Sequence, residues 1–498
     1  MHRALQLDDI IYILFHHVNE LEPSSKYSEL GDFGRKTLAA LARTCRIFHE
    51  PALNVLWGDL YFLYPLVECL QHSGDDSWYL EDHMNSLTAS DWEVLQKYVP
   101  RVLSLTISQC HGEAPFYHNQ PVAQPPLPNL QRFDCRHLIP EDYPLLNMFF
   151  VPSMTDLSLE IHPVDFPNIP LFISPLATLC PRLTSLRLFG YGSHEPIKAT
   201  VSDVIMSLPH LQTLHCDELS QAAMNFVAWH PSLTELEITI PSGHQYDFSQ
   251  FPHPALPRIP PFSRIKSFGM NSCHLTDINA FIKTVQPSPL HLRIKAVQGP
   301  SLQGLQEFFS TLSSQWRCDS MQSLQFQPNK RFPAASIDMD TIKPLLRFSK
   351  LRELLLSTLG SLLMGSSWPC LEVITLNDVR PSPITLRGLL LLVDKCPRLR
   401  SAHLAINACV LEGIEEPPVS MVGANDLQDL VLAETTVENP RAFALIVSLA
   451  FPKVKEVVMP HSWWRIPSDE PKWGKVNEYL EMFRSSEGGI EGSSCVDA

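Results

Sequence analysis

Residues 181–188 read Pro-Arg-Leu-Thr-Ser-Leu-Arg-Leu, a proline followed by apolar residues two, five and seven positions later. Leu186 and Leu188 are two positions apart, which places their side chains on the same face of a β-strand. Leu183 lies three positions before Leu186, where the chain would bend into the strand. The stretch therefore predicts a turn followed by a short strand with one buried face.

The same spacing returns along most of the chain, about 27 residues apart on average, which is within the range of leucine-rich repeats. With 43 prolines and 45% apolar residues, chance would produce roughly four proline-led copies, whereas the chain has twelve. Nine of the twelve form one series, led by Pro100, Pro128, Pro152, Pro181, Pro209, Pro231, Pro369, Pro397 and Pro452. Five further copies keep the apolar positions, and their strands are expected around Phe268, Leu292, Leu324, Leu354 and Leu430.

Helices are expected between the strands, with the proline ending each helix and setting the entry to the next strand. Proline inside a helix costs about 3 kcal/mol, so a position between the two elements suits it. Three positions after the last apolar anchor, residues such as Cys273 and Asn407 are expected to turn inward. The candidate helix caps are Ser202 or Asp203, Ser220, Thr276, Thr385 and Asn439.

One strand and one helix cannot bury their apolar faces alone, but stacked units can. The sequence therefore predicts an α/β fold, a leucine-rich-repeat solenoid of about 14 units over residues 99–465. The solenoid would be a horseshoe with parallel strands on the concave face and helices on the convex face. Residues 1–60 are expected to form a small three-helix module, 61–98 a helical linker or N-terminal cap, and 466–498 a C-terminal cap and disordered tail.

Further predictions concern the insertions and the C-terminal end of the repeats. Trp463-Trp464-Arg465 follows the last repeat and is expected to cover its open end, the alternative being an exposed protein-binding site rich in Trp and Arg. Phe116–Pro128 and Phe248–Pro261 are rich in proline and are interpreted as loops. Ser485–Ala498 is rich in Ser, Gly and Glu and is predicted to be disordered.

The composition excludes several classes of protein. The 498 residues carry a net charge of −15 without a run of Lys and Arg, so we expect no binding to nucleic acid. The longest apolar runs are far shorter than the roughly 20 residues that span a bilayer, and no stretch resembles a signal peptide. Twelve cysteines without a Cys-x-x-Cys pair, and no glycosylation sequon, favour a reducing compartment, the cytoplasm and/or the nucleus.

Motifs for catalysis and cofactor binding are missing from the sequence. It contains no Gly-rich phosphate-binding loop, no His-Glu-x-x-His and no Gly-x-Ser-x-Gly. Cys135-Arg-His137 does not have the spacing of a zinc site. We therefore expect a protein that is not an enzyme, holds no metal or cofactor, and acts by binding other proteins.

The first sixty residues do not follow the repeat and carry a resemblance to a known family. The stretch Leu38–Trp57 resembles the second half of an F-box, and Leu7–Phe15 resembles its opening helix. Asp8 stands where family members usually carry proline, and the polar loop between the first two helices is similar to that of fungal F-box proteins. The positions of the family pattern Leu…Cys-x-x-Trp/Phe…Leu-Trp are filled by Leu41, Cys45, Phe48, Leu56 and Trp57.

An F-box followed by leucine-rich repeats implies the substrate-recognition subunit of an SCF-type cullin–RING E3 ubiquitin ligase. By this resemblance, the F-box would bind a Skp-family adaptor of the cullin–RING complex and the repeats would bind a protein substrate. The alternative for the F-box residues is an ordinary small helical core. The resemblance implies adaptor binding by Leu7, Ile10, Leu14, Leu41, Cys45, Leu56 and Trp57.

Substrate contacts are expected from the strand positions between the apolar anchors, because these side chains point away from the core. Each of them could instead be a solvated surface residue. The alternative function is a leucine-rich-repeat scaffold for protein interactions with no ubiquitin role, in which the N-terminal helices serve only as a cap. The candidate substrate-binding residues are Arg132, Asp134, Asp156, Arg187, His215, Glu235, Glu237 and His403, with Arg293, Gln325 and Asp429 as further candidates.

Overall fold

The structure is a computed structural model. Some predictions concern residues that it does not describe, namely those for Leu7, His137, Trp463-Trp464-Arg465 and most of the proline-rich insertions. The chain divides into two compact units, Met1–Ala223 and Met224–Ala498, with the boundary inside α11 (Gln221–Ala228). The described residues are 8–20, 33–70, 89–107, 125–136, 146–161, 169–248, 260–296, 298, 300–316, 320–328, 339–356, 368–376, 385–409, 425–432, 437–458 and 470–487.

The first unit begins with three helices, α1 (Asp8–Glu20), α2 (Phe33–Ala42) and α3 (Arg46–Gly58). Parallel strands follow, each paired with the next in the sequence; they are β1 (Asp59–Leu60), β2 (Ser104–Ile107), β3 (Arg132–Cys135), β4 (Asp156–Glu160), β5 (Ser185–Phe189) and β6 (Thr213–Cys216). The helices between them are α4 (Tyr64–Glu68), α6 (Ala89–Leu95), η2 (Val99–Arg101), η5 (Asn147–Phe149), α8 (Ile169–Ile173), α9 (Leu176–Leu179) and α10 (Glu195–Met206).

The second unit repeats this pattern and ends in a long helix. Its parallel strands are β7 (Glu235–Thr239), β8 (Ser267–Ser272), β9 (His291–Ala296), β10 (Ser323–Pro328), β11 (Glu353–Leu356), β12 (Val373–Leu376), β13 (Ser401–Leu404), β14 (Asp429–Leu432) and β15 (Val457–Val458). Its helices are α12 (Leu275–Thr284), α13 (Leu302–Gln315), α14 (Met339–Ile342), η6 (Lys343–Arg347), α15 (Leu386–Lys395), α16 (Pro440–Ala450) and α17 (Glu470–Glu487).

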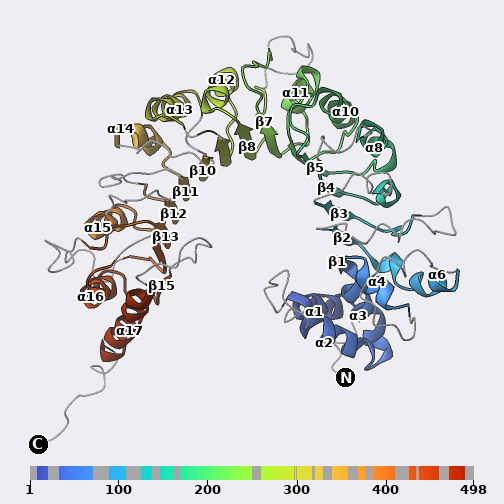
Figure 1. Cartoon of the computed structure of the whole chain (residues 1–498), viewed down its shortest axis with the longest axis horizontal. Coiled ribbons are helices and arrows are strands. Elements are labelled where there is room, and N and C mark those ends of the chain that lie inside the picture. Colours follow the sequence, from blue (N-terminus) through green and yellow to red (C-terminus); the bar gives the residue numbers. More distant parts are fainter. Residues whose placement is uncertain are drawn as a thin grey trace, which may run out of the picture. The chain divides into compact units, whose positions relative to one another are not determined.

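In each unit the helices cover one face of the strands (Figure 1). The strands alternate between buried residues on that face and partly exposed residues on the other, as in β5, where Leu186 and Leu188 are buried. We call the face turned away from the helices the inner face. All fourteen predicted copies form strands, β2 to β15, and the predicted α/β leucine-rich-repeat fold is confirmed.

The leading proline has a more specific role than ending a helix. In most copies it is the second residue of a β-turn, whose fourth residue donates its N–H to the carbonyl of the first. At Pro181, for example, Leu183 N donates to Cys180 O at 3.2 Å, and both of these residues are buried. Proline suits this position because its ring holds φ near the value that the turn requires. The same bond closes the turns at Pro128, Pro152, Pro369, Pro397 and Pro452.

Three of the predicted helix caps are confirmed by hydrogen bonds from the first turn of the helix. The side chains of Ser220, Thr385 and Asn439 accept from backbone N–H groups of α11, α15 and α16. The other two are wrong, because α10 begins at Glu195, before Ser202 and Asp203, and α12 begins at Leu275, before Thr276. In both cases an earlier position already had helical geometry.

The positions after the last anchor behave differently from one another. Asn407 turns inward and its Oδ1 accepts from Cys409 N at 3.1 Å, as predicted for a side chain that serves a turn. The prediction for Cys273 is wrong, because its side chain is exposed. Here Ser272 is the buried residue, and its Oγ accepts from His274 N at 3.4 Å.

The sheet of the first unit begins earlier than residue 99, where the solenoid was expected to start. Asp59 and Leu60 form β1 directly after α3 and pair with Ser104 and Leu105 of β2. Leu60 is buried like the anchors of later strands. The last helix of the N-terminal module therefore runs into the repeat without a linker.

Helix α17 covers the last strand of the second unit, a position for which the sequence suggested Trp463 and Trp464. Trp473, Val476 and Leu480 of α17 are buried, and the Trp473 ring packs edge-on against Phe443 of α16, with centroids 5.4 Å apart. The helix extends to Glu487, so the first residues of the predicted disordered tail are helical.

Candidate functional site

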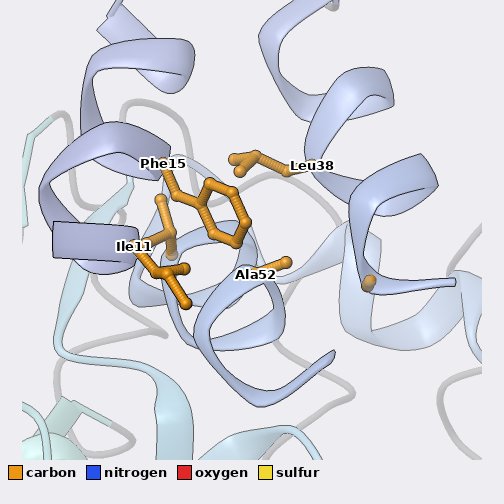
Figure 2. Packing of buried hydrophobic residues seen from close by; sticks show 6 residues of the cluster. Ile11, Phe15, Leu38 and Ala52 are labelled. Carbon is orange, nitrogen blue, oxygen red and sulfur yellow. The ribbon is translucent and has the colours of Figure 1, made fainter. Parts of the chain in front are cut away.

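The three N-terminal helices enclose a small apolar core. Ile11 and Phe15 of α1, Leu38 of α2 and Ala52 of α3 point toward one another, as Figure 2 shows. Phe15 also packs edge-on against Phe48, with ring centroids 5.5 Å apart. The spacing of Ile11 and Phe15 is one helical turn, so only one side of α1 is used for this core.

The other side of α1 exposes apolar side chains. Tyr12, Ile13 and Leu14 are 37%, 57% and 44% exposed, and Ile47 of α3 is 41% exposed. Tyr12 and Ile47 line one groove between α1 and α3, together with Asp9, Arg46, Glu50, Pro51 and Asn54. Tyr12 and Ile47 give this groove an apolar part among polar side chains, and together with Ile13 and Leu14 they are exposed apolar side chains that a protein partner could cover.

The residues implied in adaptor binding are distributed between this surface and the core. Leu14 is exposed and Ile10 is half-buried, so both can contact a partner. Leu41 and Leu56 are half-buried and pack against the core cluster. Cys45 is half-buried and lines a shallow groove with Ala42, Arg43, Arg46, His49 and Glu50.

Trp57 belongs to the junction between the helical module and the first strands. Its side chain is buried, and its ring lies 4.7 Å from that of Tyr98. It precedes β1 by the same interval as the first anchors precede later strands, so it serves as an anchor of the repeat core. Its partners leave little of it for an adaptor to touch.

The same junction carries polar contacts. Arg35 of α2 donates to the carbonyl oxygens of Leu56 and Asp59, at 3.3 and 3.4 Å. Arg101 pairs with Glu50 of α3 at 2.7 Å and also donates to Asn54. These contacts connect α2, α3, η2 and the first residue of β1.

The inner face of the first unit carries five of the predicted substrate-binding residues. The register places Arg132 beside Asp156, and Asp134, Arg187 and His215 belong to one row along β3, β5 and β6. The charged residues are paired within the face; the pairs are Arg132 with Asp59 at 3.0 Å, Arg187 with Asp156 at 3.3 Å, and Asp134 with Arg136 at 2.7 Å.

The inner face of the second unit carries the other three. Glu235 and Glu237 lie on β7, while His403 lies on β13. The side chain of Glu237 is 15% exposed and accepts from Lys295 Nζ at 2.8 Å. His403 lies in a groove of about 850 Å³ over the inner face of β13 to β15, beside Asp429. The predicted residues are therefore divided between two units.

Further charged residues of the inner faces, among them Asp59 and Lys295, were not among the predictions. Asp59, the partner of Arg132, was assigned to the helical module because β1 was not foreseen. Lys295 lies two positions after Arg293, so the strand alternation already placed it on the same face.

The thiols behave as small apolar side chains where the strands bury them. Burial raises the pKa of Cys180 to about 12, and it also raises the pKa of Cys216 and Cys396. Cys135 fills the last anchor of β3 and is fully buried. Among the described residues there is no cluster of His, Cys, Asp and Glu that could hold a metal ion. Within the same part of the chain, no helix is long and apolar enough to cross a membrane.

Comparison with models of protein families finds no match, and comparison with curated proteins finds none either. Among solved structures, the chain is similar to one from the crystal structure of a Rad7 and Elc1 complex in yeast. The two are 13% identical, with a TM-score of 0.36, over 89% of this chain and 97% of that chain.

Proposed function

We propose that this chain is the substrate-recognition subunit of an SCF-type cullin–RING E3 ubiquitin ligase, acting in the cytoplasm and/or nucleus. The three-helix module binds a Skp-family adaptor, and the inner faces of the repeats bind a protein substrate. The chain contributes no catalytic group, because ubiquitin transfer belongs to the assembled complex.

The observation that carries the proposal is the exposed apolar side of α1. A helix that serves only to close the end of a sheet would present polar residues to water, whereas α1 presents Tyr12, Ile13 and Leu14. Burying the exposed part of these side chains against a partner would gain about 25 cal/mol per Å². The F-box resemblance of Leu38–Trp57 supports an adaptor of the Skp family as that partner.

A repeat scaffold without a ubiquitin role is the second candidate, and the junction favours it. Trp57, Arg35 and Arg101 connect the helices to the first strands, which is what an N-terminal cap requires. In that case the exposed side of α1 would have no role toward an adaptor.

The two candidates are separated by adaptor capture with purified full-length chain. We expect the wild-type chain to retain a purified Skp-family adaptor and Leu14→Asp to lose at least about tenfold in affinity, because a carboxylate would be desolvated at the contact. Ile13→Asp should have a similar effect, since Ile13 is 57% exposed and does not support the core.

A matched control is Leu171→Asp on α8, which places the same charge on a leucine that is 74% exposed outside the helical module. It should bind the adaptor like wild type. Failure of the wild-type chain to bind, or equal binding by Leu14→Asp and Leu171→Asp, would leave the scaffold as the better account.

A further inference from the structure

Strand β9 places three basic side chains on the inner face of the second unit. His291, Arg293 and Lys295 alternate with Leu292 and Ile294, which are buried in the core. His291 is exposed, and the side chains of Arg293 and Lys295 are 47% and 44% exposed. The three form a column along one strand in a chain whose net charge is −15.

Neither of the two strands that flank β9 places an acidic residue of its own beside this column. The register places Ser267, Gly269 and Asn271 of β8 on one side. On the other side, β10 contributes Ser323, Gln325 and Gln327 at the same three levels. The inner face of β8 to β10 is therefore basic in its centre and bordered by hydroxyl and amide groups.

The nearest carboxylate comes from β7, one strand further along. Glu237 Oε1 accepts from Lys295 Nζ at 2.8 Å and from Asn271 Nδ2 at 3.3 Å, and Oε2 lies 3.6 Å from Arg293 Nη1. Gly269 makes this reach possible, because a Cβ there would lie 2.7 Å from Glu237 Cγ.

We propose that the inner face of β8 to β10 binds an extended acidic segment of the substrate protein, with Asp or Glu at alternate positions facing the basic column. Alternate residues of a strand lie about 6.6 Å apart, which is the spacing both of the column and of an extended peptide. Gln327 offers an amide group to the peptide backbone, whereas the amide oxygen of Gln325 accepts from Arg293 Nε at 3.1 Å and orients that guanidinium. In the free protein, the Glu237 carboxylate occupies the position of one substrate carboxylate, so the two compete for Lys295 and Arg293.

A carboxylate is the anion that this face already holds. The carboxylate that occupies it within the chain, that of Glu237, is already shared between Lys295 and Arg293. The proposal rests on one part of the proposed function, namely that the repeats bind the substrate protein. Because adaptor capture depends on α1, it can succeed or fail independently of peptide binding at β9.

The test is fluorescence anisotropy with the full-length chain and the labelled peptide Glu-Thr-Glu-Thr-Glu-Thr. Its comparison is the composition-matched peptide Glu-Glu-Glu-Thr-Thr-Thr, which cannot present carboxylates at three alternate positions on one face. We expect the alternating peptide to bind more tightly. Lys295→Gln should weaken it about tenfold, and Arg293→Gln similarly, because each removes a charge-assisted contact. Glu237→Gln should strengthen binding several-fold by removing the competitor.

Lys283→Gln is the matched control, since Lys283 is also half-exposed and paired with a carboxylate, that of Glu307, but lies on the helical side. It should leave peptide binding unchanged, and thermal melting should confirm that all variants are folded. The proposal is overturned if Lys283→Gln and Lys295→Gln weaken binding equally, or if Glu237→Gln has no effect. It is also overturned if the two peptides bind equally or only a phosphoserine version binds.

Discussion

Replacing Asn477 by leucine should destabilise the C-terminal end of the second unit by about 2 kcal/mol. Asn477 lies on α17, where its Oδ1 accepts from Val457 N at 2.9 Å and its Nδ2 donates to Val457 O at 3.1 Å. The side-chain amide thus makes the pair of hydrogen bonds that a following strand would make with β15. Leucine has a similar size but offers neither a donor nor an acceptor.

The magnitude follows from the surroundings of Val457. An unsatisfied buried polar group costs about 1–3 kcal/mol. Val457 itself is 2% exposed, whereas the neighbouring Val458 is 42% exposed, so water reaches part of this edge. We therefore take the lower value for the N–H and for the C=O, which together amount to about 2 kcal/mol. Asn477→Asp keeps the acceptor for Val457 N but turns a carboxylate oxygen toward Val457 O, so it should cost at least about 1 kcal/mol.

Urea unfolding followed by circular dichroism measures this loss, with Lys475→Ala as the control on the exposed side of the same helix. The leucine variant should also form concentration-dependent oligomers in size-exclusion chromatography, because an unpaired strand edge offers hydrogen bonds to another chain. If Asn477→Leu differs from Lys475→Ala by less than about 0.5 kcal/mol and stays monodisperse, the amide does not complete the strand edge.

Three further predictions concern the repeats of the first unit and the thiols. Leu186→Asp should open or unfold the first unit, because Leu186 is fully buried. Arg187→Ala should cost at most about 1 kcal/mol in urea unfolding, since about a third of each side chain in its ion pair is exposed. Equal effects of the two substitutions would mean that the assignment of buried and exposed strand positions is wrong. Pro181→Ala should cost about 0.4–1 kcal/mol in the same assay, through the added freedom of the unfolded chain; no loss would contradict the turn role. In the native protein at pH 8, the exposed Cys273 should react with a thiol reagent. Cys180 should stay unmodified, because burial raises its pKa to about 12. Peptide mapping identifies the labelled residues, and rapid labelling of Cys180 would contradict its burial.

The repeat was predictable from the sequence because its signal is periodic and local. Each strand needs two apolar residues two positions apart, and a single proline can set the turn before them. Even the poorest copy, in which Pro289 stands where the first apolar anchor would precede Leu292 and Ile294, forms a six-residue strand, because β8 and β10 pair with it on both sides. The stacking of neighbours corrects a weak local signal.

The two ends of the repeat were harder to predict, because there the periodic signal stops. β1 has only two residues, Asp59 and Leu60, and its pairing with β2 is not visible from so short a stretch. At the other end, Trp473, Val476 and Leu480 have the spacing of one helix face, so α17 could have been found by the same rule that found the earlier helices.

The contacts on the inner faces required the structure, because they join residues far apart in the sequence. The sequence pattern places Glu237 and Arg293 on the same face, but it cannot show that Gly269 leaves room for Glu237 to reach β9. The alternation of the strands thus places residues of both charges on the inner faces, whereas their grouping into pairs and a basic column depends on which strands are neighbours.

The two candidate functions are compatible with one another, because they use different sides of the same helices. Trp57 and Arg35 face the start of the sheet and stabilise it, whatever else the module does. Ile13 and Leu14 face away from the core and contribute nothing visible to that cap. A substitution at Ile13 or Leu14 therefore tests adaptor binding without weakening the repeat, whereas one at Trp57 changes both. For this reason the exposed positions of α1, rather than the strongest family positions of α3, are the ones that can decide between a ligase subunit and a scaffold.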